Sequence, residues 1–109
     1  MMVMKLLSRS EEVILVTIMK LGDKAYGVKI REQIEQDTGS LWSFATIYRP
    51  LDKMTRNQLV QKVKGEPTAE RGGKSKFYYT VTPAGEQALL ELQMAHSRIW
   101  DGLTLKSGL

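Results

Sequence analysis

A short amphipathic helix predicted for residues 44–57 restricts the fold more than any other feature of the chain. Ser43 is a good N-cap residue for this helix. Ile47, Leu51 and Met54 follow at positions i, i+4 and i+7, which predicts one buried stripe. Another face carries Thr46, Arg49, Lys53 and Arg56. A helix with a core stripe and a basic stripe is typical of one that reads the major groove of DNA, although solvated basic faces are also common.

Pro50 lies inside this predicted helix, too far from its start to be a first-turn proline. It removes one backbone hydrogen bond and crowds the preceding turn, at a cost of roughly 3 kcal/mol in a regular helix. We therefore expect a kink at Pro50, or a helix that effectively begins later than Phe44.

The positive charge of the chain is concentrated in one middle segment. The 109 residues have a formal net charge of +4. Residues 43–76 hold eight basic and three acidic side chains, a net charge of +5, whereas residues 1–42 are neutral and residues 77–109 have a net charge of −1. A localised positive surface favours a polyanionic partner, nucleic acid first. A solvated basic face without a partner stays open as the alternative.

The composition argues against several functional classes. A chain of 109 residues suits one domain with a single modest core. It has no cysteine, and its one histidine has no metal-binding partner at i+4, so we expect no disulfide, metal or cofactor. No catalytic motif is present, so we expect no enzyme activity. The apolar runs are too short to span a membrane and no signal peptide is evident, which favours a cytoplasmic protein without membrane contact.

Two further helices are predicted before the amphipathic one. Ser8 and Glu11 form a capping-box pattern that opens a largely apolar helix ending near Gly22, with a buried strand as the competing prediction. Residues 25–38 form a second helix by their apolar spacing, closed by Gly39. Residues 41–42 could form a very short strand.

The second half of the chain predicts a hairpin followed by a long helix. Residues 59–64 and 75–81 alternate apolar and polar side chains, and the polar, glycine-bearing stretch between them is typical of a hairpin tip. Thr82 and Pro83 then open a helix of about 28 Å that extends to Asp101.

The last helix has an apolar seam with heptad-like spacing. The seam comprises Leu89, Leu92, His96, Ile99 and Leu103, with Trp100 beside it. Because a domain this small has little surface left to cover such a seam, we expect a second copy of the chain to do so in a two-fold homodimer. The alternative is that the helix folds back on its own core.

The order of these elements predicts an α+β, mainly α fold: a winged helix-turn-helix with a C-terminal dimerisation helix. The winged-helix domain would span residues 1–82, and residues 83–109 would form the dimerisation helix and tail. In this fold the third helix enters the major groove and the hairpin tip contacts the flanking backbone. Both basic clusters would then face double-stranded DNA.

Several short motifs resemble those of one protein family. They are Ala25-Tyr26-Gly27, Ala45-Thr46-Ile47-Tyr48, Leu59-Val60, Gly72-Gly73-Lys74-Ser75-Lys76-Phe77-Tyr78-Tyr79 and Val81-Thr82-Pro83-Ala84-Gly85. In this order they resemble a PadR-type transcriptional regulator over nearly the whole chain, in its short branch with one C-terminal helix. The resemblance implies a dimeric DNA-binding repressor, often released by a small molecule or a stress signal.

The chain departs from the family pattern at three positions. Ala45 stands where the family usually has glycine, and Arg49 separates Tyr48 from the proline that usually follows it directly. Gln58 stands where a glycine usually closes the third helix. The last change matters for the backbone, because glutamine adopts a positive φ poorly.

The candidate DNA-contacting residues come from the third helix and the hairpin. Arg49 is placed to reach a guanine edge, and Lys53 and Arg56 are better suited to phosphate. Tyr48 could bond a phosphate, or its ring could pack under the second helix. The full candidate set for a palindromic operator is Ser43, Thr46, Tyr48, Arg49, Lys53, Arg56, Arg71, Lys74 and Lys76.

His96 and Trp100 have two interpretations. Both belong to the predicted dimer interface, where they would simply pack. By the family resemblance, aromatic residues on this helix can also line a pore between subunits that holds a small, flat, apolar effector. Two functions of other classes stay open: a winged-helix adaptor that binds proteins and not DNA, and a ligand carrier that uses the pore alone.

Overall fold

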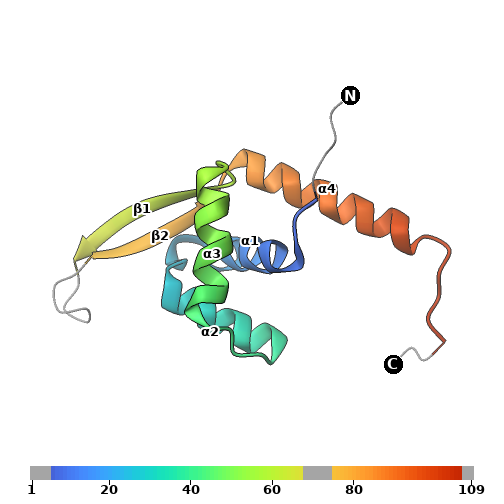
Figure 1. Ribbon diagram of the computed structural model, residues 1–109, viewed down its shortest axis with the longest axis horizontal. Coiled ribbons are helices and arrows are strands. Elements are labelled where there is room, and N and C mark those ends of the chain that lie inside the picture. The colour runs from blue at the N-terminus through green and yellow to red at the C-terminus, as the bar shows by residue number, and fades with distance from the viewer. Residues whose placement is uncertain (1–5, 68–74, 107–109) are drawn as a thin grey trace.

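The computed structural model describes residues 6–67 and 75–106, in which three helices and a two-stranded hairpin precede one long helix (Figure 1). The elements are α1 (Arg9–Leu21), η1 (Gly22–Lys24), α2 (Gly27–Thr38), α3 (Phe44–Arg56), β1 (Val60–Pro67), β2 (Ser75–Val81) and α4 (Pro83–Trp100). This order confirms the predicted α+β, mainly α fold. Among residues 6–67 and 75–106, no helix combines the length and the hydropathy of a membrane-spanning segment.

Helix α1 is the central element of the core. The predicted capping box is confirmed: Glu11 N donates to Ser8 Oγ over 3.2 Å, and Ser8 N donates to the Glu11 carboxylate over 2.8 Å. Ile14, Leu15 and Ile18 are buried, and α1 contacts α2, α3, β2 and α4. The apolar segment is therefore a buried helix, as the cap predicted, and not a buried strand.

Helix α2 begins at Gly27, two residues later than predicted, because the preceding residues are extended. Tyr26 forms an isolated antiparallel bridge with Tyr78, and Tyr79 N donates to the Ala25 carbonyl over 2.8 Å. The short strand predicted at residues 41–42 is wrong, since this segment has no strand pairing and the Trp42 carbonyl accepts a side-chain hydrogen bond from Arg31 instead.

Helix α3 runs without interruption through Pro50. Ser43 caps it by accepting a hydrogen bond from Thr46 N over 3.1 Å, so the expectation of a later start is wrong. The predicted stripe is confirmed, since Ile47, Leu51 and Met54 are all fully buried. Packing of this stripe offsets the backbone hydrogen bond that Pro50 cannot donate.

The turn after α3 contains an uncommon backbone conformation. Gln58 has φ 63°, the left-handed region in which the family usually has glycine. Its carbonyl accepts a 2.7 Å hydrogen bond from the Thr82 hydroxyl, and Thr82 N donates to the Leu59 carbonyl over 3.0 Å. The end of α3 is thereby tied to the start of α4, and Thr82 is the N-cap of α4, as predicted.

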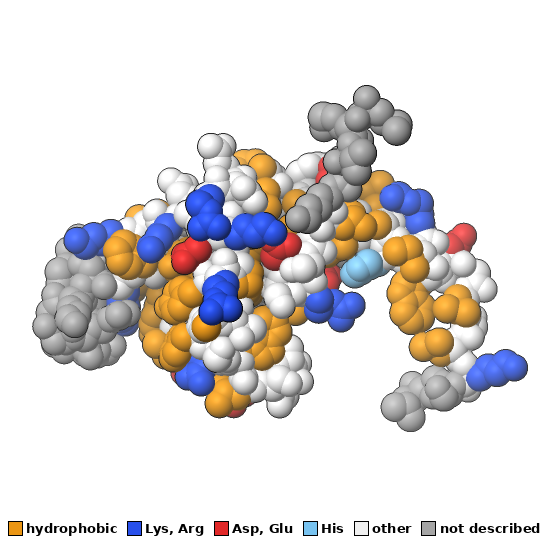
Figure 2. Space-filling view, in the orientation of Figure 1, with side chains coloured by type: hydrophobic (Ala, Val, Ile, Leu, Met, Phe, Trp, Pro, Cys, Tyr) orange, Lys and Arg blue, Asp and Glu red, His pale blue; other side chains and the backbone are white. Residues whose placement is uncertain are grey.

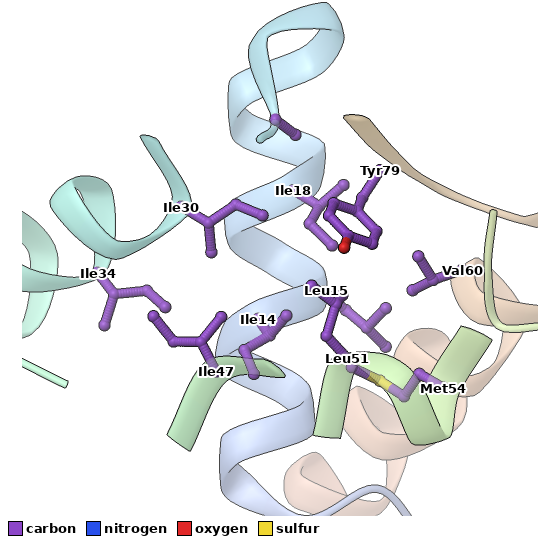
Figure 3. Close-up of a cluster of buried hydrophobic side chains, with 11 residues drawn as sticks. Ile14, Leu15, Ile18, Ile30, Ile34, Ile47, Leu51, Met54, Val60 and Tyr79 are labelled. Carbon is purple, nitrogen blue, oxygen red and sulfur yellow. The ribbon is translucent and has the colours of Figure 1, made fainter. Parts of the chain in front are cut away.

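Strands β1 and β2 pair antiparallel from Val60↔Val81 to Lys64↔Phe77, with a register shift between Lys64 and Pro67. The hairpin forms the wing, which extends from the helices in Figure 1. The core lies where the base of the wing meets the three helices, as the labelled side chains of Figure 3 show. It comprises Ile14, Leu15, Ile18, Ala25, Ile30, Ile34, Ile47, Leu51, Met54, Val60 and Tyr79.

Candidate nucleic-acid interface

The exposed side of α3 carries a row of polar and basic side chains. Because the row is spaced three and four residues apart, it lies along one face of the helix. It comprises the exposed residues Thr46, Arg49, Lys53 and Arg56. The buried stripe fixes the rotation of α3 about its axis, so this row must face outward. Figure 2 shows lysine and arginine side chains gathered over α3 and along the wing.

The charges of this row are not all equally available. Within residues 6–67 and 75–106, Arg49 and Arg56 make no ion pair. Lys53 Nζ lies 3.9 Å from a carboxylate oxygen of Glu11 on α1. The row therefore contains two free guanidinium groups on either side of one ammonium group that already has an acidic neighbour.

The N-terminal end of α3 is held by contacts that leave part of it exposed. Ser43 Oγ lies 2.8 Å from Thr46 Oγ1 in addition to its capping bond, so this serine has a structural role. The half-buried ring of Tyr48 stacks on Phe44, with ring centroids 6.0 Å apart. Arg31 of α2 lies 4.4 Å from the centroid of the Phe44 ring. These contacts hold α3 against α2.

The position of the Tyr48 ring explains why the first residue of α2, Gly27, has no side chain. The ring and hydroxyl of Tyr48 occupy the space that a Cβ at Gly27 would need. The ring thus packs against α2, as one of the two sequence interpretations predicted. Its hydroxyl lies beside the first turn of α2, whose unpaired N–H groups favour an anion.

The three wing residues predicted from the sequence separate into two groups, and β1 adds two lysines that were not predicted as contacts. Arg71 and Lys74 lie outside the described residues. Lys76 is buried, and its ammonium group lies 4.2 Å from the centroid of the Tyr26 ring. Lys62 and Lys64 belong to the basic segment but were not predicted as DNA contacts, and both are exposed on β1. Because they lie two residues apart on a strand, their side chains are on the same face, which could have indicated a shared basic surface.

The predicted interface residues of α4 differ in exposure along the helix. Leu92 is buried and Leu89 packs against the core, so the first half of α4 does fold back on its own domain. His96 is half-buried. Ile99 and Trp100, at the end of α4, are 70% and 52% exposed. Leu103 is 59% exposed but lies beyond the end of α4 at Trp100, so its predicted place in the helical seam is wrong. In Figure 1 this second half of α4 extends away from the other elements.

A groove of about 690 Å³ lies between α1 and α4. Its lining combines the apolar residues Val16, Met19, Pro83, Leu89 and Leu90 with the polar residues Glu12, Glu86, Gln87, Gln93 and His96. Trp100 does not line this groove. Within the described residues, this groove therefore holds His96 without Trp100.

The three-helix arrangement with a two-stranded wing defines a winged helix-turn-helix, the fold class predicted from the order of the elements. The model of the Transcriptional regulator PadR-like family matches residues 14–91, and the chain belongs to this family. It is a DNA-binding transcriptional regulator, and membership favours DNA binding over the adaptor alternative. The family is one of transcriptional regulators and not of enzymes. No curated protein matches the chain.

Solved structures of other proteins show the same fold. A transcriptional regulator from Clostridium thermocellum is 23% identical, covers 87% of this chain and 90% of its own, and has a TM-score of 0.63. A PadR-like transcriptional regulator from Bacillus cereus is 21% identical, with 82% of each chain covered and a TM-score of 0.67. Bordetella bronchiseptica BpsR, whose DNA binding is regulated by 6-hydroxynicotinic acid, is 18% identical, with 90% and 68% covered and a TM-score of 0.60.

Proposed function

We propose that this regulator is a homodimeric cytoplasmic repressor that binds a palindromic operator with α3 in the major groove. The observation that supports this most directly is the outward row on α3. Its two guanidinium groups, Arg49 and Arg56, make no ion pair with the described residues and lie opposite a fully buried apolar stripe. Arg49, nearer the helix start, is assigned to a guanine edge, because a guanidinium group can donate two hydrogen bonds to O6 and N7. Lys53 and Arg56 are assigned to phosphates.

The wing is assigned to the flanking DNA backbone. Lys62 and Lys64 support this role because they are exposed on β1, which packs beside the end of α3. Arg71 and Lys74 stay candidates for the same role from the sequence. Lys76 is removed from the proposed surface because its side chain is buried against Tyr26. Contacts with the DNA backbone add affinity that depends on the salt concentration and not on the DNA sequence.

The proposed dimer uses the second half of α4. Ile99 and Trp100, together with Leu103 just after the helix, form an exposed apolar end with no cover from the described part of the chain. The groove between α1 and α4, with the apolar side chains Val16, Met19, Leu89 and Leu90, is a second surface without cover from the described residues. In a two-fold dimer, the exposed helix end of each copy can pack into the groove of the other copy. Because the dimer is symmetric, this contact forms twice and covers both helix ends and both grooves. Two copies of α3 would then meet two half-sites.

The same region is the proposed effector site. His96 is one of the residues that line the groove, and Trp100 of the partner copy would bring an aromatic ring to it. The apolar side chains Val16, Met19, Leu89 and Leu90 can hold a small, flat, apolar compound. The polar lining residues Glu12, Glu86, Gln87, Gln93 and His96 can bond a polar group on it. Its binding between subunits would change the spacing of the two α3 helices and so release the operator.

DNA binding by the purified full chain tests the main proposal. Fluorescence anisotropy is measured with a duplex from the promoter upstream of its own gene and with a scrambled duplex, across a salt series. We expect tighter binding to the promoter duplex and an affinity that falls with salt. An adaptor would bind neither duplex. Quenching of tryptophan fluorescence by flat apolar compounds, without any DNA binding, would instead support a ligand carrier.

A further inference from the structure

A buried carboxylate lies directly behind the basic row of α3. Glu11 belongs to α1, and its side chain is only 11% exposed, whereas that of Lys53 is 47% exposed. One carboxylate oxygen of Glu11 accepts the 2.8 Å hydrogen bond from Ser8 N. The other lies 3.9 Å from Lys53 Nζ. The tertiary fold therefore brings an acidic side chain from another helix to a lysine of the proposed DNA-binding row.

The groups around the Glu11 side chain attract negative charge. Its carboxylate lies at the first turn of α1, where free backbone N–H groups and the helix dipole attract negative charge. Arg49 and Lys53 line a hollow of about 480 Å³ here together with Ser8 and Glu11. Glu11 supplies that negative charge from within the protein, at the surface where the proposed function requires DNA phosphate to approach.

The separation of Glu11 and Lys53 indicates how they act on each other. A distance of 3.9 Å is beyond hydrogen-bond reach, so the interaction is coulombic and Lys53 keeps its donors. A phosphate oxygen bonded to Lys53 would lie at most about 7 Å from the carboxylate, within the screening length of about 8 Å at physiological salt. Glu11 would therefore both offset the charge of Lys53 and repel the phosphate.

We infer that Glu11 is a positioning residue that limits sequence-independent DNA binding by offsetting the charge of Lys53. The inference rests on the proposed DNA-binding role of α3. A lysine with an acidic neighbour releases fewer counterions when it contacts phosphate, so it contributes less of the affinity that every DNA sequence shares. The binding energy that remains then depends more on Arg49 and on base contacts, which raises the preference for the operator.

Glu11→Gln separates this role from the structural role of Glu11. Glutamine also serves at the N3 position of a capping box, so the hydrogen bond to Ser8 N is retained while the charge is lost. Lys53→Gln removes the partner charge, and the double variant completes a cycle. Glu35→Gln is the matched control, because it removes the same charge from an exposed position on α2. Thermal unfolding of each variant checks that the fold is kept.

Affinity for the scrambled and promoter duplexes is measured for all variants by anisotropy across a salt series. We expect Glu11→Gln to bind the scrambled duplex about threefold more tightly, with a salt slope steeper by up to about 0.9, and to lose part of its promoter preference. In the Lys53→Gln background the same change should have little effect, since Glu11 acts through Lys53. Glu35→Gln should resemble the wild type.

Each outcome bears on the inference. An unchanged scrambled-duplex affinity in Glu11→Gln, with normal DNA binding by the wild type, overturns the inference and leaves the proposed function standing. An equal gain in the Lys53→Gln background, or in Glu35→Gln, also overturns it, because the effect would then be one of net charge. Absence of binding by both the wild type and Glu11→Gln overturns both proposals.

Discussion

The ring of Tyr48 on α3 occupies the space that a side chain at Gly27 would fill at the start of α2. This contact joins the two helices of the helix-turn-helix at the end of α3 that carries Thr46 and Arg49. Gly27 of the Ala25-Tyr26-Gly27 motif and Tyr48 of the Ala45-Thr46-Ile47-Tyr48 motif therefore pack against each other. The pose of α3 therefore depends on Gly27, a residue for which no DNA contact is proposed.

Gly27→Ala is expected to destabilise the fold by about 1–3 kcal/mol, because the added methyl group overlaps the Tyr48 hydroxyl and ring carbon. Chemical denaturation of the purified chain measures this change. Combining Gly27→Ala with Tyr48→Phe removes the nearest overlapping atom and should restore part of the loss. If Gly27→Ala is as stable as the wild type, Tyr48 moves aside freely and does not set the pose of α3.

Gln58→Gly is expected to stabilise the chain by up to about 1 kcal/mol. The backbone at Gln58 has φ 63°, which costs a residue with a Cβ roughly 1–2 kcal/mol, and part of the gain is offset by the greater entropy of glycine in the unfolded chain. Asn57→Gly is the matched control, since Asn57 has φ −87° and should lose stability on the same change. Equal losses at both positions would contradict this account.

Arg49→Ala is expected to weaken binding to the promoter duplex by about 1–3 kcal/mol and to reduce the preference over the scrambled duplex, because a base contact is lost. Lys62→Ala should weaken binding to both duplexes alike and lower the salt slope by about 0.9. Anisotropy titrations at several salt concentrations distinguish the two patterns. If Arg49→Ala lowers both affinities equally, Arg49 is a phosphate contact.

Ile99→Asp is expected to convert the proposed dimer to a monomer without unfolding it, since Ile99 is 70% exposed in the single chain. A buried charge at the interface would be costly, whereas the same charge on a monomer is solvated. Sedimentation analysis measures the mass, and circular dichroism checks the fold. Ser97→Asp, an exposed change on another side of α4, should leave the mass unchanged. A monomeric wild type would contradict the proposed dimer.

The stability of the fold should fall at alkaline pH through Tyr79. Burial is the main cause that raises the pKa of Tyr79 to about 12 from its ordinary value of 10.0. Above pH 10 the unfolded chain ionises this phenol more readily than the folded chain, so the contribution of Tyr79 is complete below that pH and is lost between pH 10 and 12.

The loss should amount to about 1–3 kcal/mol relative to Tyr79→Phe, which cannot ionise. Denaturation of both proteins at successive pH values isolates the contribution of Tyr79 from that of the lysines, which both proteins share. The difference in tyrosinate absorbance between the wild type and Tyr79→Phe gives the pKa of Tyr79, because both proteins contain the same three other tyrosines. Parallel stability curves for the two proteins between pH 10 and 12 would contradict a raised pKa for Tyr79.

Most of the helical architecture could be predicted because its signals are local. The caps at Ser8, Ser43 and Thr82 act within one turn, so they mark helix starts wherever the chain goes. The stripe of α3 follows from its spacing alone. Pro50 led us to expect a kink or a later helix start, but α3 is continuous from Phe44 to Arg56. Tertiary packing of the buried stripe stabilises the helix against the local effect of the proline.

The features that the sequence did not reveal all join segments far apart in the chain. The burial of Lys76 against Tyr26, the extended pairing of Tyr26 with Tyr78, and the approach of Glu11 to Lys53 each need the folded wing or α1 to be in place. No local spacing encodes them, because they depend on which surfaces meet. The elements, their buried faces and the basic segment follow from local patterns in the sequence, whereas the folded structure shows which of the described basic side chains are exposed and which are buried or have an acidic neighbour.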